Sequence, residues 1–195
     1  MKKRILVFGL LLVLMSSFVI GVTIIVNTNS DLDLQDPKMY LSIGDFLVKK
    51  GFKIQALAFY EKGLTLDPDN IKLLNNKGIA KLDENIDAAK NYFEKALEID
   101  PDYQMARKNL ALIYTKKKDY IKAVDEFRIL VENNPENIKY NYDLAINLGN
   151  KFYHETRSIK DLAEALFYFK KVNNQAPGFL KTKENIKVLE KIKQL

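Results

Sequence analysis

The sequence predicts an all-α fold: an α-solenoid of about four helix–turn–helix repeats with a C-terminal capping helix, preceded by an N-terminal transmembrane helix. Three observations support this prediction. Two closely similar segments, FYEKGLTLDP at 59–68 and YFEKALEIDP at 92–101, begin 33 residues apart. Prolines follow the same rhythm along the chain, and an uncharged apolar run occupies the N-terminus. A period of this length is typical of stacked repeat architectures.

The N-terminal segment, residues 1–26, is predicted to be a transmembrane anchor. The basic MKKR is followed by an uncharged run from Ile5 to Val26. As a helix this run would measure about 33 Å, enough for a hydrocarbon core of about 30 Å. The alternative is a secretory signal peptide, but its apolar region is shorter, about 7–15 residues, so we favour an uncleaved anchor. The basic end would remain cytoplasmic, which predicts a single-pass membrane protein with its repeats on the extracytoplasmic, periplasmic side.

Composition restricts the chemistry that the chain can perform. With no cysteine, it has no disulfide, no thiolate metal site and no cysteine nucleophile. The only histidine is His154, and no motif for a nucleophile, a phosphate loop or a metal site occurs. The formal charge of +6 includes the three charges of the N-terminal KKR, so the rest of the chain is of mixed sign. We therefore expect no catalytic or metal-binding residue, no cofactor, no enzymatic activity and no nucleic-acid partner.

Each of four prolines follows an amphipathic helical segment. The prolines are separated by 33, 34 and 42 residues and are Pro68, Pro101, Pro135 and Pro177. Three positions recur before each proline and share one helical face because they lie 12, 8 and 5 residues upstream. They hold a small residue (Ala56, Ala89, Ala123, Ala165), an aromatic ring (Tyr60, Phe93, Phe127, Phe169) and a small or medium residue (Gly63, Ala96, Leu130, Val172). Proline then ends the segment.

A second helical segment precedes each of these, and it carries a small residue at a matching place. These residues are Gly44, Gly78, Ala111 and Ala145. A small side chain allows two helices to approach closely, so each pair of segments predicts a helix–turn–helix unit. One such unit cannot bury its apolar face alone, whereas stacked units form a continuous core.

This pattern resembles the tetratricopeptide repeat. The third unit matches the family's pattern best, through Leu110, Ala111, Tyr114, Tyr120, Ala123, Phe127 and Pro135. The second unit is one residue short, and the fourth carries about eight additional residues around NKFYHETRS. The resemblance implies a linker at 27–36, repeats at 37–70, 71–103, 104–137 and 138–179 (the last with the insertion), and a capping helix at 180–195.

In the family that this chain resembles, the first helix of each repeat lines the concave side of the superhelix. The positions implied for a peptide-binding groove are Leu41, Asp45, Val48, Asn75, Asn76, Ile79, Lys108, Asn109, Leu112, Lys139, Tyr142, Asp143 and Ile146. Asparagine amides can pair with the backbone of an extended peptide, and the apolar residues can bury its side chains. The alternative, that these residues partly fill contacts between adjacent helices, remains open.

Heat-shock-protein-binding members of the family hold a terminal carboxylate in a clamp of two Lys, two Asn and an Arg. The aligned positions here read Asn75, Ile79, Asn109, Lys139 and Asp143. Only Asn109 and Lys139 agree with the clamp, and Asp143 places a negative charge where an arginine is needed. We therefore expect no carboxylate clamp of this type.

The sequence thus predicts a membrane-anchored, non-enzymatic scaffold or adaptor that binds a peptide or helix of a partner protein in the concave groove. Two alternatives remain open. One is a chaperone-like assembly factor for cell-envelope proteins, and the other is a structural membrane protein that self-associates. No residue pattern indicates the partner's identity, the oligomeric state or the role of the insertion around His154.

Overall fold

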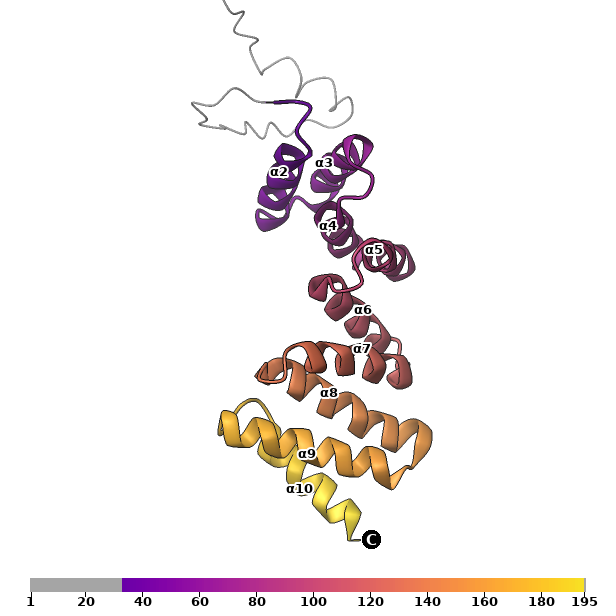
Figure 1. The fold of residues 1–195 in the computed structure, drawn as a ribbon, viewed down its shortest axis with the longest axis vertical. Helices are drawn as coiled ribbons and strands as arrows, with labels where there is room; N and C mark the ends of the chain where they lie inside the picture. The colour runs from indigo at the N-terminus through magenta and orange to yellow at the C-terminus, as the bar shows by residue number, and fades with distance from the viewer. Residues whose placement is uncertain (1–32, 195) are drawn as a thin grey trace, which may run out of the picture. The chain divides into compact units, whose positions relative to one another are not determined.

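The structure is a computed structural model that describes residues 33–194, and over that range it consists of helices joined by short turns (Figure 1). The elements are α2 (Pro37–Lys49), α3 (Lys53–Leu66), α4 (Ile71–Lys81), α5 (Ile86–Ile99), α6 (Gln104–Lys116), α7 (Tyr120–Asn133), α8 (Ile138–Lys151), the π-helical turn η1 (Phe152–Thr156), α9 (Ile159–Gln175) and α10 (Thr182–Lys193). Within the described residues there are nine α-helices and no strand. The predicted all-α solenoid is confirmed for this part of the chain.

Each helix packs against the next in sequence, and alternate helices also meet. The contacts join α2 to α3, α3 to α4 and so on to α10, while α2 touches α4 and α4 touches α6. Figure 1 shows the helices stacked one after another in chain order. The first helices of successive pairs therefore lie beside one another, an arrangement that can present one continuous surface.

Five of the helices begin at an Asp or Asn whose side-chain oxygen accepts a hydrogen bond from a backbone N–H of the first turn. These N-cap residues are Asp36, Asn70, Asn85, Asp119 and Asn137. Such caps satisfy donors that have no partner within the helix. The short polar segments between the predicted helices thus have a direct structural role: each stops one helix and starts the next.

The core is built from the recurring rings and the small residues that face them. Tyr60, Phe93, Phe127 and Phe169 are all buried. A Cβ atom at Gly78 would lie 2.7 Å from Cε1 of Phe93, and a Cβ atom at Gly44 would overlap the ring of Tyr60. Only glycine permits these rings to approach the neighbouring helix so closely. These contacts agree with the expectation that a small residue at these places allows two helices to approach closely.

The insertion in the fourth pair forms η1, which ends at Arg157 in the left-handed region (φ 52°). Asp161 closes this turn, since its carboxylate accepts from Thr156 Oγ1 at 2.6 Å and pairs with Lys151 Nζ at 3.0 Å. The turn also reaches the preceding pair, where Glu155 Oε1 accepts the backbone N–H of Tyr120 at 3.0 Å. The insertion therefore caps the start of α7.

The predicted localisation requires correction. None of the helices described between residues 33 and 194 combines the length and the apolar character needed to cross a membrane. The longest of them, α9, has 17 residues, about 26 Å against the ~30 Å of a bilayer core, and it carries charged side chains. The prediction of a single-pass membrane protein is thus contradicted by this part of the chain. The predicted anchor at 1–26 lies outside the described residues.

Candidate functional site

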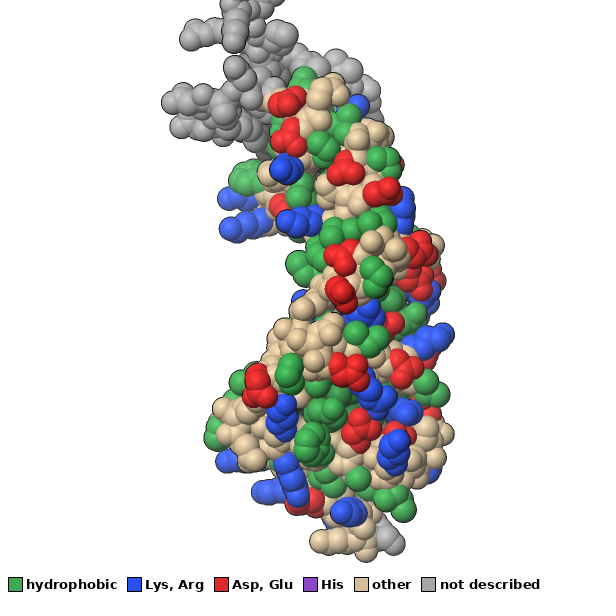
Figure 2. All heavy atoms as spheres, in the orientation of Figure 1, with side chains coloured by type: hydrophobic (Ala, Val, Ile, Leu, Met, Phe, Trp, Pro, Cys, Tyr) green, Lys and Arg blue, Asp and Glu red, His purple; other side chains and the backbone are tan. Residues whose placement is uncertain are grey.

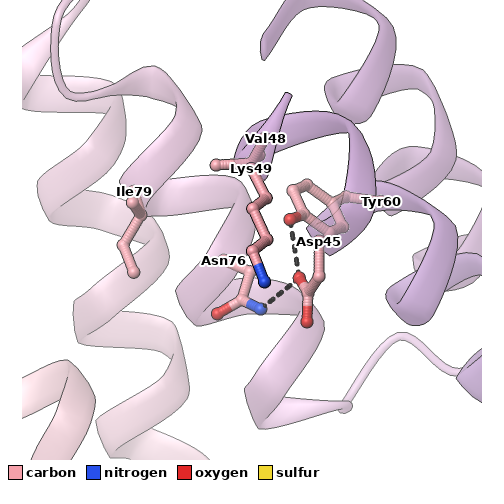
Figure 3. A pocket seen from close by; sticks show the side chains of 6 residues that line it. All are labelled: Asp45, Val48, Lys49, Tyr60, Asn76 and Ile79. Carbon is pink, nitrogen blue, oxygen red and sulfur yellow. Dashed lines mark hydrogen bonds between the residues drawn. The ribbon is translucent and has the colours of Figure 1, made fainter. Parts of the chain in front are cut away.

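An open pocket of about 210 Å³ lies between the first two helical pairs (Figure 3). Helix α2 contributes three side chains; the second and third lie three and four residues after the first, so all three point to the same side of the helix. Helix α4 contributes two side chains three residues apart, and α3 contributes one. The lining residues are Asp45, Val48, Lys49, Tyr60, Asn76 and Ile79. Charged and amide groups thus share the pocket with two aliphatic side chains.

The carboxylate of Asp45 is held in place by two donors from neighbouring helices. Asp45 Oδ1 accepts from the hydroxyl of Tyr60 at 2.7 Å and from Nδ2 of Asn76 at 2.7 Å. Figure 3 shows these two bonds, with the side chain of Lys49 also pointing into the pocket. Asp45 is nevertheless an exposed residue, so the two bonds orient a charge that solvent or a ligand can reach.

The hydroxyl of Tyr60 stays protonated at physiological pH. Burial raises the pKa of Tyr60 above its usual value, and the hydrogen bond to Asp45 and the negative charge of that carboxylate raise the pKa further. A neutral hydroxyl is a donor, so Tyr60 continues to orient Asp45 across the physiological range.

The hydrogen bonds continue from this pocket across α4 to α6. Asn75 Nδ2 donates to Asn76 Oδ1 at 2.8 Å, and Asn109 Nδ2 donates to Asn75 Oδ1 at 2.9 Å. We call the connected side chains of Asp45, Asn76, Asn75 and Asn109 the amide ladder. Because it links three successive first helices, the ladder keeps their polar faces in register.

The predicted groove residues fall into separate groups in the structure. Asp45, Val48, Asn76 and Ile79 come together in the pocket, and Asn75 and Asn109 extend it through the ladder. Leu41 and Lys108 are partly buried, Leu112 is exposed and Ile146 packs against the core. Lys139 and Asp143 form an ion pair at 3.2 Å. These placements leave the groove itself a prediction.

Tyr142 is partly buried against the core of the fourth pair, and its ring is edge-on to those of Phe169 and Phe179 at centroid distances of 5.7 and 5.5 Å. These ring contacts join α8 to α9 and to the segment that follows it. Sequence reasoning missed Lys49 and assigned Tyr60 only to the core. A signal for Tyr60 was present, since it is the one hydroxyl among the four ring positions, and a buried hydroxyl needs a partner.

Asp143 is a mostly buried carboxylate, and this burial disfavours its charge. Burial raises the pKa of Asp143, and the nearby ammonium groups of Lys139 and Lys108 only partly oppose this effect. The folded state therefore binds this proton more tightly than the unfolded chain does. It follows that the contribution of Asp143 to stability improves as pH falls through its folded pKa and is least favourable above that pKa.

We expect Asp143→Asn to raise the melting temperature at pH 7 by roughly 2–4 °C, the shift that about 1 kcal/mol produces in a domain of this size. The difference from the unchanged protein should shrink as the pH is lowered, because Asp143 is then protonated in the folded state. Thermal unfolding followed by circular dichroism over a pH series measures this, with the exposed Asp125→Asn on α7 as control. An unchanged or lower melting temperature at pH 7 would contradict the expectation.

Among residues 33–194, no group of three or more His, Cys, Asp or Glu side chains is arranged to hold a metal ion. Figure 2 shows basic and acidic side chains interspersed over the visible face of the described helices.

Comparison with protein families gives two matches, both to models described as tetratricopeptide repeat, at residues 37–70 and 80–145. Together they cover just over half of the chain. Among curated proteins, the chain is 42% identical to the "Protein STIP1 homolog" of Dictyostelium discoideum over 77 residues, which are 35% of this chain and 14% of that protein. It is 37% identical to the "Protein O-mannosyl-transferase TMTC3" of Homo sapiens over 73 residues, 36% of this chain and 8% of that protein. The chain thus spans a small part of the length of these relatives.

Solved structures with the same arrangement of helices include YrrB, described as "a TPR protein with an unusual peptide-binding site". It superposes with a TM-score of 0.71 at 25% identity and covers 82% of this chain and 79% of its own. The MamA protein superposes with a TM-score of 0.69 at 22% identity, covering 82% of this chain and 83% of its own. At that identity the likeness to MamA concerns the fold alone.

Proposed function

Because this chain belongs to the tetratricopeptide repeat family, we propose that it is a non-enzymatic protein-interaction scaffold that binds an extended segment of a partner across α2, α4 and α6. Domains of this family typically bind protein partners. The segment would cross the Asp45 pocket and continue along the amide ladder. The repeat boundaries expected from the sequence, including the capping helix, are part of this proposal.

The orientation of Asp45 is the observation that carries the proposal. Its carboxylate is exposed, yet the bonds from Tyr60 and Asn76 hold it in one orientation beside an open pocket. A charged acceptor fixed in this way can accept a strong hydrogen bond from a backbone N–H or a cationic side chain of a ligand, with little ordering cost. Val48 and Ile79 border the same space and can bury an apolar side chain of that ligand.

The amide ladder supports an extended backbone as the ligand. Each asparagine side chain has two donor hydrogens and an acceptor oxygen, and the ladder uses only part of this capacity. Asn109 is partly exposed, and its oxygen accepts no hydrogen bond from the residues that the structure describes. Such amides can pair with the peptide groups of a bound strand without reading its sequence.

Two kinds of relative bear differently on this proposal. YrrB has the same fold and is described as having a peptide-binding site, which favours a peptide ligand here. The O-mannosyl-transferases share only a stretch that is about a tenth of their length. We therefore do not extend their enzymatic activity to this chain.

Photo-cross-linking in cells that express the full chain tests this function. A photoreactive amino acid at Val48 or at Ile79 should capture the same partner protein. The same group at Lys62, an exposed position on α3, should not. No captured protein from either pocket position, or equal capture from Lys62, would reject the proposal.

Once a partner is captured, we expect Asp45→Ala to weaken its binding about tenfold or more, since a hydrogen bond to a charged group contributes roughly 1.5–3 kcal/mol. Isothermal titration with the partner's bound segment measures the change. Asp69→Ala, an exposed aspartate in the turn after α3, is the matched control. Unchanged affinity for Asp45→Ala would show that the pocket does not hold the ligand.

A further inference from the structure

Successive pairs of helices stack through one side of each first helix. On α4, α6 and α8 this side comprises the positions five and one before the recurring small residue and two after it. They hold Leu73, Lys77 and Ala80; Ala106, Leu110 and Ile113; and Tyr140, Leu144 and Asn147. Tyr140 is partly buried and the others are buried. This side meets the second helix of the preceding pair: a Cβ atom at Gly63 of α3 would lie 2.8 Å from Cδ1 of Leu73, and Lys77 pairs with Glu61.

On α2 the same positions hold Met39, Ile43 and Phe46. Because α2 is the first of the described helices (Figure 1), no described helix of a preceding pair covers them. Phe46 is 45% exposed, and the other two are partly exposed. Asp36 and Lys50 continue the same spacing of three and four residues, so all five lie on one side of the helix. We call Asp36, Met39, Ile43, Phe46 and Lys50 the α2 face.

The last described helix, α10, ends the array differently. Ile186 and Leu189 pack it against the core beside α9. The side on which the other first helices meet their own second helix is polar on α10, where it carries Lys183, Lys187 and Glu190. A terminal element of a repeat array is expected to have such a polar outer side. The α2 face has an apolar centre instead, which is typical of a surface that contacts another protein.

The α2 face carries opposite charges at its two ends. Asp36 lies seven residues before Ile43, and Lys50 lies seven residues after it, so each is about 10 Å from the centre of the face. Nζ of Lys50 lies 5.7 Å from the centroid of the Phe46 ring. Neither Asp36 nor Lys50 forms an ion pair with another residue of the range 33–194. The face is therefore complementary to a second copy of itself in the antiparallel orientation.

We propose that two copies of this chain form a symmetric dimer through their α2 faces, with the two-fold axis at Ile43. A two-fold axis pairs identical surfaces, so it requires a self-complementary face. Ile43 contacts its own counterpart, and Phe46 of each copy packs near Met39 of the other. Asp36 of each copy pairs with Lys50 of the other. One helical face is smaller than the ~800 Å² per partner of stable complexes, so we expect a dissociation constant on the order of 10 μM.

The dimer has a consequence for ligand binding. Asp45 also belongs to α2, so the two Asp45 pockets would lie on adjacent helices. A partner that offers two segments could then occupy both pockets and bind more tightly than one segment alone. This consequence rests on the proposed function, whereas the dimer itself does not.

Cysteine cross-linking of the full chain tests the dimer, because the chain has no cysteine of its own. Ile43→Cys should form a disulfide-linked dimer under mild oxidation. Met39→Cys alone should not, since its two copies would be separated by about 12 Å along the helices, beyond the ~7 Å between Cα atoms that a disulfide permits. An equimolar mixture of Met39→Cys and Phe46→Cys should form a mixed dimer. Lys62→Cys, at an exposed position on α3, controls for association through other parts of the chain.

The charges at the two ends are tested in the Ile43→Cys background. Lys50→Glu alone and Asp36→Lys alone should each lower the linked fraction about tenfold, because each places like charges together at both ends of the face. A mixture of these two variants has opposite charges at both ends and should recover the linkage. Asp36→Asn retains an N-cap acceptor and separates the effect of charge from that of the cap. Circular dichroism of each variant verifies folding.

Three results would overturn the proposal: no linked dimer of Ile43→Cys at about 50 μM protein, which is above the expected dissociation constant, equal linkage of Lys62→Cys, or no recovery in the mixture of charge variants. A photoreactive amino acid at Ile43, in mixed light and heavy isotope-labelled chains, identifies the occupant by mass spectrometry. Reaction between light and heavy chains at α2 supports the dimer. Reaction with residues 5–26 of the same chain, or with a different protein, rejects it.

The dimer and the proposed function fail separately. Asp45→Ala should leave the linkage of Ile43→Cys unchanged, because Asp45 lies outside the α2 face. Phe46→Asp should abolish that linkage and leave the capture of a partner from Val48 in place. Loss of only one of the two readouts therefore identifies which of the two proposals is wrong.

Discussion

Phe127→Ala should lower the free energy of unfolding by about 3–5 kcal/mol, the usual cost of truncating a buried phenylalanine. Phe127 is fully buried on α7, and its cluster includes Leu144 of α8 and Ala165 of α9. The substitution removes dispersion contacts and leaves a cavity that the surrounding helices fill only in part. The effect should therefore reach beyond the third helical pair.

A linear array of repeats is stabilised by contacts between neighbours, so a weak central pair can separate the array into two parts. We expect urea unfolding of Phe127→Ala, followed by circular dichroism and tyrosine fluorescence, to show a lower midpoint and a broader transition than the unchanged protein. Ile121→Ala on the same helix is the control, because Ile121 is 49% exposed and its truncation should cost well under half as much. Equal losses for the two variants would contradict the assigned core.

Asp161→Ala should cost about 3 kcal/mol, because it leaves the mostly buried ammonium of Lys151 without its partner. Asp161 also accepts from Thr156 Oγ1, so the same change releases the end of η1. Thermal unfolding measures the loss of stability. Hydrogen exchange of the segment 152–158 measures the opening of the turn, which should be faster in the variant.

Two further variants separate the charge of Asp161 from its hydrogen bonds. Asp161→Asn retains an oxygen that can accept from Thr156 and should lose less stability than Asp161→Ala. Lys160→Ala changes an exposed neighbour and should have little effect. If Asp161→Ala unfolds like the unchanged protein and η1 exchanges at the same rate, the ion pair does not hold the insertion in place.

The helices and the core followed from local patterns in the sequence. The recurrence of Phe93 and Phe127 at matching distances before a proline predicted buried rings, and both are buried. Helical periodicity and turn chemistry act over fewer than about ten residues, so one sequence is enough to read them. The resemblance to tetratricopeptide repeats rested on the same positions, and the family matches agree with it.

The predicted membrane localisation was inferred from composition at the N-terminus alone. The described helices contain no membrane span. The groove positions were carried over from the family's concave face, one helix at a time. That transfer could not distinguish Asn76, which lines a pocket, from Tyr142, which is partly buried against the core. Which side of a helix meets its neighbour depends on the angle between successive pairs, and no single helix encodes that angle.

The sequence by itself determined that this protein is a stack of helical pairs, because the spacing of its rings, small residues and prolines is a local property. Only the tertiary structure decided which side chains meet around the pocket at Asp45. In the folded chain the hydroxyl of Tyr60 on α3 donates to Asp45 on α2. Glu155 of the insertion accepts the first backbone N–H of α7, and a Cβ atom at Gly149 would have no heavy atom within 4 Å. Each of these depends on how separate helices meet, and the period of the sequence does not specify that geometry.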